Sequence, residues 1–398
     1  MKRSDFNLLN NDIVYFDSAA TTLKPKCVVD KITSYYNDYS SNIHRGEYDI
    51  AERAEAEYNK AREIVASFLN ANNDEIVFTS GTTDSLNMII NEYFKNLLNP
   101  GDEVLLTEAE HASLILPWFN LVNELGIVVK YISLDDNYHV TIDNVINAIT
   151  NKTKVISLAQ ITNVIGDVRP IKDICKIAHE RGIKVLVDGA QSVPHMKVDV
   201  KDLDVDYLTF SGHKMCGPTG VGVLYGKKEL LEKLKPTRLG GGMNSSFDAP
   251  DQIILKELPI RLEAGTPNIE GVIGLGEAVN YINNIGIDNI YKHECDLKAY
   301  FIDKTKDIPF IKIVNESSDS GIISLTIDGI FPQDVGYYLN KYNICVRTGN
   351  HCAKLLKNVI GTDQTLRISL YLYNTKEDID KIVALLSDRE RIMKEMLV

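Results

Sequence analysis

Asp188 and Lys214 are the two residues whose types and positions point most directly to chemistry. Asp188 ends a short apolar run that begins at Lys184 and is followed by a Gly-Ala turn, which is typical of a buried parallel strand with a functional end. Lys214 closes a Ser-Gly-His-Lys segment after a second apolar run, at 207–210. In open α/β sheets ligands bind at the carboxyl ends of the strands, so neighbouring strands could bring this acid and this amine to one ligand.

A lysine and a carboxylate that face one ligand suit pyridoxal phosphate. A lysine amine holds this cofactor as a Schiff base, and a carboxylate keeps its ring nitrogen protonated, so that the ring can take up the electrons of a substrate carbanion. Ser211 and His213, beside the lysine, are candidates for binding the phosphate and the ring substituents. Asp188 taken alone also suits a helix cap, and Lys214 a surface lysine, but the stretch 184–225 as a whole favours the cofactor site.

Polar residues also follow three other predicted strands. Thr82 and Thr83 open a helix after the strand at 75–79, where free backbone N–H groups and the helix dipole favour a phosphate, although an ordinary N-cap looks similar. We assign both threonines to the cofactor phosphate. His111 follows the strand at 102–106 and is a reasonable cofactor contact, although a lone histidine is more often structural. Asn163 follows the strand at 154–159 and is a candidate donor to the cofactor ring oxygen.

A second group of reactive residue types lies near the end of the chain. Cys352 follows a Gly-Asn-His turn, with Arg347 and Lys354 close in sequence, and positive neighbours favour a thiolate over a thiol. Most cysteines are packing residues, so the spacing alone also allows a structural role. Arg367 lies in a predicted strand, and an arginine suits bidentate recognition of an amino acid carboxylate, or alternatively a structural ion pair.

The composition excludes several classes of protein. The 398 residues are 44% apolar, enough for two domains with a sizeable core. The formal charge of −12 argues against a nucleic-acid binder. The sequence has neither a signal peptide nor an apolar run of membrane-spanning length. Six scattered cysteines without a Cys-x-x-Cys pair predict no metal site and a reducing compartment, and we expect a cytoplasmic protein.

Strands and helices alternate between about 75 and 225, which predicts a mostly parallel sheet with helices on both faces. We expect strands at 75–79, 102–106, 154–159, 184–188, 207–210 and 220–225, and a crossover helix at 170–182. Helices are predicted at 26–40, 50–68, 270–284 and after 376. Strands at 322–327 and 366–370 predict a second, smaller domain.

Several motifs resemble those of one family. The Val-Asp-Gly-Ala-Gln run that ends at Gln191, together with the Ser-Gly-His-Lys segment, resembles the core of the class V aminotransferase group of pyridoxal phosphate fold type I. The run Arg347-Thr-Gly-Asn-His-Cys352-Ala is similar to the "Arg-x-Gly-His-His-Cys-Ala" pattern of group II, SUF-type cysteine desulfurases. The resemblance extends from about residue 13 to about residue 390.

The resemblance implies an α/β fold. It predicts a large domain at 16–260 with a mostly parallel seven-stranded sheet, in which the strand at 220–225 is antiparallel, and a smaller α+β domain at 261–398 that also includes residues 1–15. The run Asp17-Ser-Ala-Ala-Thr-Thr22 is expected near the mouth of the active site. Cofactor contacts are expected from Thr82, Thr83, His111, Asn163, Asp188, Gln191, Ser211, His213, Lys214 and Thr266, the last reaching the other subunit of a homodimer. Substrate contacts are expected from Arg367, Arg347, His44 and Asn163.

The activity implied by the resemblance is a pyridoxal-phosphate-dependent cysteine desulfurase. Lys214, Cys352 and His111 are the expected catalytic residues: Lys214 as the base, Cys352 as the thiolate that takes the sulfur of L-cysteine as a persulfide, and His111 stacked on the cofactor ring. The other product is L-alanine. A SUF-system protein then accepts the sulfur for iron–sulfur cluster assembly.

Three departures and three alternatives accompany this prediction. Asn350 replaces a histidine of the family pattern, so that thiolate stabilisation could be weaker or shared with His351. Ser80 stands where many relatives have arginine. Cys216, close to Lys214, is a competing thiol that we expect to be a packing residue. A selenocysteine lyase and a class V aminotransferase are the alternative enzymes. The third alternative is a regulator with this fold, which usually carries an appended DNA-binding domain, for which the short arm before residue 16 leaves no room.

Overall fold

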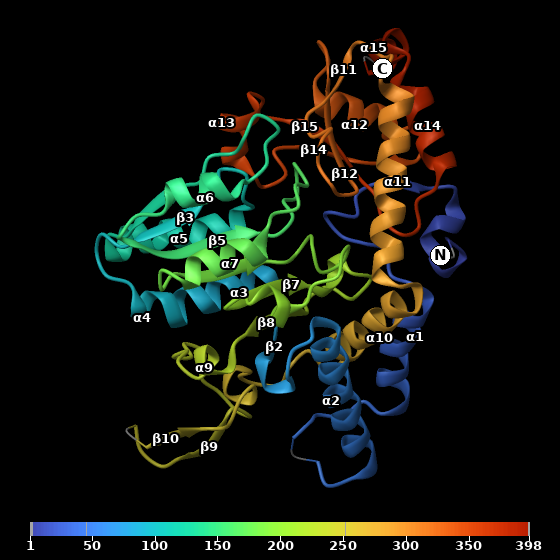
Figure 1. The fold of residues 1–398 in the computed structure, drawn as a ribbon. Helices are drawn as coiled ribbons and strands as arrows, with labels where there is room; N and C mark the ends of the chain where they lie inside the picture. Colours follow the sequence, from blue (N-terminus) through green and yellow to red (C-terminus); the bar gives the residue numbers. More distant parts are fainter. Residues whose placement is uncertain (1–2, 45, 251, 397–398) are drawn as a thin grey trace.

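A seven-stranded sheet forms the centre of the larger part of the chain (Figure 1). It is seen in a computed structural model that describes residues 3–44, 46–250 and 252–396. The strand order is β2-β8-β7-β6-β5-β3-β4; β8 is antiparallel to both neighbours, and the other adjacent strands are parallel. The strand bounds are β2 Ile76–Thr79, β3 Glu103–Leu106, β4 Val128–Tyr131, β5 Thr153–Ala159, β6 Lys184–Asp188, β7 Tyr207–Ser211 and β8 Gly222–Gly226.

The mostly parallel sheet of seven strands, with β8 antiparallel, confirms the predicted fold class. Six of its strands lie within two residues of their predicted ranges, because their runs are apolar and rich in β-branched residues. The edge strand β4 is absent from the prediction. Its Val-Val-Lys-Tyr run is partly exposed and too short for a clear pattern.

Alternate residues of the strands face two separate hydrophobic cores. Val185 and Val187 of β6 belong to one core, whereas Leu186 between them belongs to the other. Helix α7 packs in the first core and helices α3 and α5 in the second, so the sheet is covered on both faces. The helices of this part are α1 Lys26–Asp38, α2 Asp49–Leu69, α3 Thr82–Ile89, α4 Lys95–Leu97, α5 Ala112–Leu125, α6 Ile142–Ala148, α7 Ile171–His179, α8 Val200–Leu203, α9 Lys228–Leu231 and α10 Ile269–Ile285.

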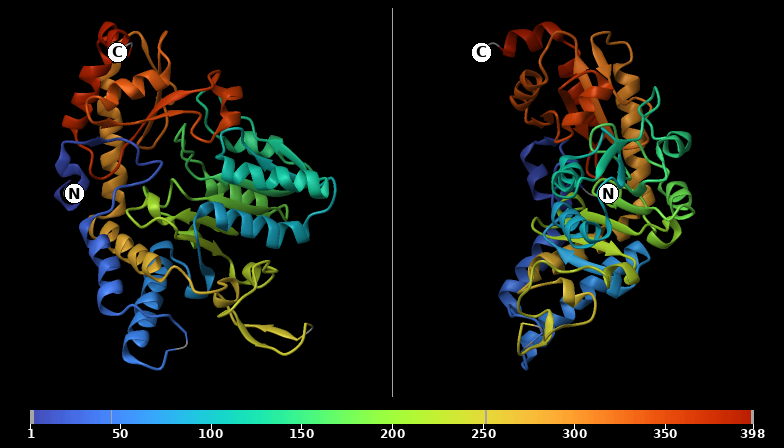
Figure 2. Two further views of the ribbon diagram at one scale, coloured as in Figure 1. Left: turned by 180° about the vertical axis from the view of Figure 1, so that it is seen from behind. Right: turned by 90° about the vertical axis from the view of Figure 1, so that its left-hand side faces the viewer.

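A smaller part lies beyond the end of the sheet, at the top of Figure 1, and has its own core. Its antiparallel sheet has the order β11-β12-β15-β14 and includes both predicted strands. The bounds are β11 Ile311–Ile313, β12 Ile322–Ile327, β14 Arg347–Gly349 and β15 Thr365–Ser369; the helices are α11 Ile287–Thr305, α12 Pro332–Asn340, α13 Lys357–Ile360, α14 Lys376–Leu386 and α15 Arg389–Met396. Helix α11 runs from α10 along this part, and both views of Figure 2 show the same arrangement.

The N-terminal arm is joined to the smaller part by backbone pairing. Strand β1 (Val14–Tyr15) runs parallel to β13 (Ile344–Cys345), and the next turn of the arm bridges to Ser369 at the end of β15. This pairing supports our proposal that residues 1–15 and 261–398 make up one domain. Helix α10, which that division places in the smaller domain, instead packs on α1 and α2.

Two segments connect helices of the larger part, one between α9 and α10 and the other between α1 and α2. The hairpin of β9 (Asn244–Phe247) and β10 (Ile253–Leu255) follows the glycine-rich segment 239–243 and extends away from the body of the molecule (Figure 2). Residues 41–44 and 46 form neither helix nor strand, and Arg45 lies outside the described residues. Among the described residues, no helix combines the length and the apolar character needed to cross a membrane.

Glycines allow α10 to lie close against α1 and α2. A Cβ at Gly276 would lie 2.8 Å from the Cβ of Ala61 and 3.0 Å from its Cα, and a Cβ at Gly274 would lie 2.8 Å from the Cγ1 of Ile32. At Gly276 the obstacle includes the backbone of α2, which cannot turn aside as a long side chain could. The approach of the two helices therefore requires glycine at this position.

We predict that Gly276→Val lowers the free energy of unfolding by about 1–3 kcal/mol, because the added methyl groups overlap α2. Chemical denaturation of the purified protein measures the change. Asn284→Ala, on the exposed side of the same helix, is the control and should stay within about 0.5 kcal/mol of the parent. Equal stability of the valine variant and the parent would show that α2 can move away.

Candidate active site

A cavity of about 330 Å³ lies where the carboxyl ends of the sheet strands meet the smaller part of the chain. Asp188 ends β6, Ser211 ends β7 and Ala159 ends β5, and all three line the cavity. The smaller part contributes Arg347 and Arg367 from adjacent strands, and the loop with His351 and Cys352. The position matches the general rule for ligand sites in open α/β sheets.

Most of the predicted site residues line this one cavity. They come from eight separate segments of the chain, and the fold brings them together: Thr82, Thr83, His111, Asn163, Asp188, Gln191, Ser211, His213, Lys214, Arg347, Cys352 and Arg367. Ala19 and Ala20 also line it, as expected for the run at 17–22. Thr266 and His44 do not line this cavity of their own chain.

Lys214 and Asp188 influence each other's ionisation. Burial lowers the pKa of Lys214 to about 8, and the carboxylate of Asp188 partly opposes this effect. Burial raises the pKa of Asp188 to about 6, with Lys214 acting in the opposite direction. Asp188 Oδ1 accepts a hydrogen bond from the backbone N–H of Ala190 at 2.9 Å, which holds the carboxylate at the end of its strand. Near neutral pH the site therefore combines an ionised acid with an amine that readily loses its proton.

His111 and His213 are neutral in this environment. The pKa of both is lowered to about 4, mainly by burial and in addition by the nearby charge of Lys214. His111 caps α5: its Nδ1 accepts the backbone N–H of Ser113 at 3.1 Å, so the ring proton resides on Nε2. A neutral ring held in this way presents its face without adding positive charge to the cavity.

Hydroxyl groups gather at the start of α3. The backbone N–H and the Oγ1 of Thr82 both lie 2.8 Å from Ser211 Oγ, and Thr83 Oγ1 lies 2.7 Å from Ser113 Oγ. Gly81 precedes the helix at φ 153°, and a Cβ there would meet Ser211 Oγ at 3.3 Å. Hydroxyl groups together with the free N–H groups of a helix start suit an anion, in agreement with the predicted phosphate site.

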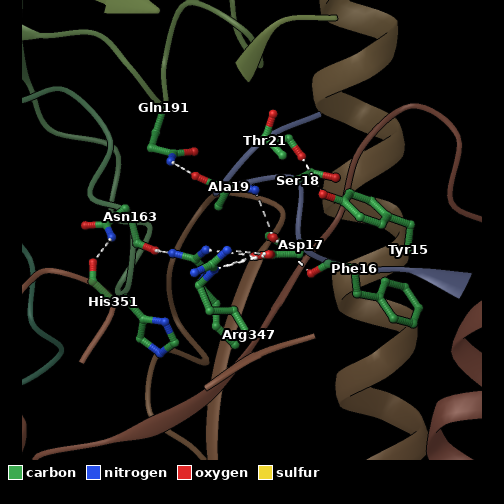
Figure 3. A network of polar contacts seen from close by, with 12 residues as sticks. Tyr15, Phe16, Asp17, Ser18, Ala19, Thr21, Asn163, Gln191, Arg347 and His351 are labelled. Carbon is green, nitrogen blue, oxygen red and sulfur yellow. Dashed lines mark hydrogen bonds and ion pairs between the residues drawn. The ribbon is translucent and has the colours of Figure 1, made fainter. Parts of the chain in front are cut away.

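Four buried polar atoms of the cavity wall have no hydrogen-bond partner among the described residues: Asn163 Oδ1, Gln191 Oε1, His351 Nδ1 and Arg367 Nε. The opposite ends of these side chains are held. Asn163 Nδ2 donates to the carbonyl of His351 at 2.7 Å, and Gln191 Nε2 donates to the carbonyl of Ala19 at 2.7 Å (Figure 3). Since buried polar atoms are rarely left without partners, the cavity is built for a polar ligand. The free atom of Asn163 is an acceptor, so the predicted donation to a ring oxygen requires its amide group to turn.

Cys352 is exposed at the cavity, on a loop that hydrogen bonds hold in place. His351 and Cys352 both have a left-handed backbone, with φ of 51° and 59°, which is uncommon for residues with side chains. The carbonyl of Cys352 accepts the N–H of Ala112 at 2.7 Å, next to His111, and its own N–H donates to Asn350 Oδ1 at 3.1 Å. The thiol is therefore brought to the cavity by a specific turn.

The structure gives Asn350 and His351 different roles from those weighed in the sequence. Asn350 accepts the N–H of Cys352 and so shapes the turn. His351 Nε2 lies 2.9 Å from Thr365 Oγ1. Burial lowers the pKa of His351 to about 3. An imidazole that stays neutral cannot stabilise a thiolate as a cation. Arg347, Arg367 and Lys214 are cations that line the same cavity as Cys352.

Three residues lie outside the cavity. Thr266 is exposed and lines a separate hollow of about 220 Å³ with Ser80 and Arg238. His44 hydrogen bonds to Glu55, with Nδ1 3.3 Å from Oε1, so its substrate contact stays a prediction. Cys216 is fully buried and burial raises its pKa to about 12, which confirms the prediction of a packing residue.

A buried network behind the cavity wall is absent from the sequence prediction. Arg169 forms ion pairs with Glu110 and, through Nε at 3.0 Å, with Asp167, and all three side chains are almost completely buried. Glu110 Oε2 also accepts the N–H of Ala159 at 2.9 Å, and Thr162 Oγ1 donates to Asp167 at 2.7 Å. The network thus joins the segment before His111 to the one before Asn163. Residues 62 positions apart, such as Thr107 and Arg169, meet here, and no local spacing could have indicated this.

We predict that Arg169→Ala lowers the free energy of unfolding by about 3–5 kcal/mol, because Glu110 and Asp167 would remain buried without a cation. Chemical denaturation measures the loss. Arg181→Ala is the control: this arginine is 43% exposed, lies 3.9 Å from its partner Glu180, and should contribute less than about 0.5 kcal/mol. A similar small loss in both variants would contradict a supporting role for the network.

Known proteins resemble the chain along almost its whole length. The family model of aminotransferase class-V matches residues 14–382. A probable cysteine desulfurase of Halalkalibacterium halodurans is 41% identical over 95% of this chain and 93% of its own. The solved structure of a cysteine desulfurase from Thermococcus onnurineus superposes with a TM-score of 0.92 at 35% identity, covering 97% and 96% of the two chains. The solved structure of cysteine desulfurase CsdA from Escherichia coli superposes with a TM-score of 0.92 at 37% identity, covering 98% of this chain and 97% of its own. The chain therefore belongs to the aminotransferase class-V family, and the three proteins compared above are cysteine desulfurases or a probable one.

Proposed function

We propose that the chain is a pyridoxal-phosphate-dependent cysteine desulfurase that converts L-cysteine to L-alanine and takes up the sulfur on Cys352. The observation that carries this proposal is the presence of Lys214, Asp188, Arg367 and an exposed Cys352 in the wall of one cavity. An aminotransferase has no use for a thiol at this position. The 41% identity to a probable cysteine desulfurase, over almost the whole chain, supports the same activity.

The residues of the cavity fit pyridoxal phosphate. When bound, this cofactor makes a covalent link to a lysine amine and accepts the electrons released as bonds at the substrate Cα and Cβ break. Lys214 would hold it, Asp188 would pair with its ring nitrogen, and the hydroxyl groups of Thr82, Thr83 and Ser211 would take its phosphate. The unpartnered buried atoms of Asn163 and Gln191 provide further polar contacts.

Substrate binding and proton transfer follow from the charges of the wall. The buried Nε of Arg367 has no partner among the described residues, so its N–H is available for the carboxylate of the amino acid, and Arg347 is the register partner of Arg367. Lys214, once released, is the base that takes the Cα proton, and its pKa of about 8 suits that task near neutral pH. The neutral ring of His111 provides a flat surface for stacking.

Sulfur transfer is the task of Cys352. Its thiolate forms an S–S bond with the substrate sulfur while the substrate C–S bond breaks, which leaves a persulfide on the enzyme; the carbon skeleton takes up a proton and leaves as alanine. We further propose that a protein of the SUF system accepts this sulfur for iron–sulfur cluster assembly, as the Arg347-to-Ala353 motif of group II enzymes indicates.

A homodimer is also part of the proposal. Thr266 is exposed and lies outside the cavity of its own chain, as expected for a residue that reaches the cofactor phosphate of the other subunit. We place the enzyme in the cytoplasm, since its six cysteines are free thiols, as a reducing compartment requires.

We predict that Cys352→Ser abolishes persulfide formation and at least about 99% of sulfide release, since a hydroxyl cannot accept sulfur, while the cofactor stays bound. Purified protein is incubated without oxygen with L-cysteine and dithiothreitol, and sulfide, alanine and cofactor absorbance are followed together. The parent should release sulfide and alanine in equal amounts. Cys295→Ser, which removes a thiol from α11 outside the cavity, is the control and should behave like the parent.

The same experiment separates the alternative enzymes. Persulfide in the Cys352→Ser variant would contradict the assignment of the sulfur acceptor. Alanine formed from L-selenocysteine, with L-cysteine inert, would indicate a selenocysteine lyase. Pyridoxamine phosphate without alanine or sulfide would indicate an aminotransferase.

We predict that cofactor-free protein captures pyridoxal phosphate at a rate that rises with pH and levels off above about 8, since the neutral amine attacks the aldehyde and burial lowers the pKa of Lys214 from 10.5 to about 8. Stopped-flow absorbance measures the rate, with Lys214→Ala as the blank. In Asp188→Asn the midpoint should move to lower pH, because the carboxylate that raises the pKa of the amine is gone. A midpoint close to 10.5 in the parent would show that Lys214 behaves as an exposed lysine.

A further inference from the structure

Arg347 and Arg367 lie directly opposite each other in adjacent antiparallel strands. They are register partners of β14 and β15, and both line the cavity. Like charges in directly opposed positions destabilise a sheet. Arg367 is also 2% exposed, so that water does little to screen its charge. This pair therefore requires a counter-ion.

Asp17 is that counter-ion. Its Oδ2 accepts from Nη2 of Arg347 at 2.8 Å, and both of its oxygens lie within 3.1 Å of Nε of the same arginine. Its Oδ1 also accepts from Nη2 of Arg367 at 3.2 Å, and Figure 3 shows Asp17 beside the guanidinium group of Arg347. Asp17 does not itself line the cavity. It acts on the cavity through the two arginines.

The backbone holds Asp17 in this position. Phe16 donates its N–H to the carbonyl of Cys345 at 2.8 Å and accepts the N–H of Ser369 at 2.7 Å. Ser369 Oγ accepts the N–H of Ala19 at 2.9 Å. The backbone of Asp17 is thus fixed between the end of β13 and the end of β15, the strand that carries Arg367. Its carboxylate therefore starts from a fixed point next to both arginines.

An anion of the right shape could take the place that Asp17 occupies. Arginines bind carboxylate, sulfate and phosphate with pairs of N–H groups, and Arg367 keeps a buried Nε without a partner among the described residues. Two unneutralised arginines at a cavity would thus bind inorganic anions, which would block the substrate. The charge of Asp17 lowers the affinity of the pair for every anion alike.

We propose that Asp17 is a positioning residue that acts as the resident counter-ion of the substrate-carboxylate site and excludes free inorganic anions from it. An amino acid substrate overcomes this competition because its amine is captured in the same cavity, which gives its carboxylate a high effective concentration at Arg367. A free sulfate has no second point of attachment. This inference rests on the proposed function for the identity of the substrate, but the charge balance of the arginines stands without it.

The test uses the holoenzyme and sulfate. Asp17→Asn keeps an oxygen for Nη2 of Arg367 but removes the charge that neutralises Arg347. We expect sulfate to inhibit the L-cysteine reaction of this variant competitively, with an inhibition constant roughly tenfold lower than in the parent, as the loss of one charge-assisted contact implies. An unchanged inhibition constant would overturn the proposal. So would equal weakening of sulfate and L-cysteine binding, which a merely structural role of Asp17 would cause.

Two variants control the charge effect. Asp12→Asn removes a charge from the same arm, where the side chain is 84% exposed and pairs with Lys381, and should leave the sulfate inhibition constant unchanged. Asp17→Asn combined with Arg347→Gln should return the inhibition constant to near the parent value, because the cation that Asp17 had neutralised is gone. Persistent tight inhibition by sulfate in the double variant would contradict the assignment of Arg347 as the cation that Asp17 neutralises.

A second measurement does not depend on catalysis. Sulfate should raise the thermal unfolding midpoint of Asp17→Asn more than that of Asp12→Asn at the same concentration, and equal shifts would overturn the proposal. This comparison holds even if the parent does not act on L-cysteine, so the two proposals fail separately. If Asp17→Asn does not fold, Asp17→Ser, which also removes the charge, takes its place in both measurements. Sulfate inhibition and sulfate stabilisation equal to those of the parent in Asp17→Ser would refute the role of Asp17.

Discussion

The convergence of parallel strands on one edge of the sheet is the constraint on which the site depends. Strands β5, β6 and β7 are mostly buried on both faces, and apolar residues make up most of their length. At their carboxyl ends the chain leaves both cores, so Asp188 and Ser211 can be polar there without loss of packing. The ends of neighbouring parallel strands are adjacent, and residues far apart in sequence therefore meet at one cavity.

The sheet alone does not complete the site. The arginine that we propose for the substrate carboxylate and the thiol that we propose for the sulfur come from the smaller part, and the run at 17–22 contacts both parts. Thr21 and Thr22 of this run donate to the carbonyl of His213, beside Lys214, while Asp17 binds the arginines. The short run at 17–22 thus fixes the distance between the lysine and the carboxylate site. Its small residues are needed because the backbone itself passes along the cavity wall.

Much of the fold and most of the site residues could be predicted, because both are encoded locally. Apolar β-rich runs that end in polar residues indicate the central strands, and segments such as the one around Lys214 carry their own chemistry. The interactions that support these residues could not be predicted. The pairing of Asp17 with Arg367 joins positions 350 residues apart, and the edge strand β4 lacks a clear pattern. The sequence shows Asn350 as the replacement of a histidine near the thiol, whereas its hydrogen bond to the N–H of Cys352 shows a residue that shapes the turn.

The distribution of hydrogen-bond partners separates supporting residues from reactive ones. Arg169, the centre of the buried network, is surrounded by acceptors: two carboxylates, the carbonyl of Ala159 and the hydroxyl of Thr107. Arg367 is equally buried, yet its Nε has no partner among the described residues, and burial lowers its pKa to about 10. Of two equally buried arginines, one therefore has hydrogen-bond acceptors around its guanidinium group, whereas the other lacks an acceptor at Nε among the described residues. Because an incomplete buried cation is unstable, its presence has to be explained by a ligand, and Asp17 limits the cost until that ligand arrives.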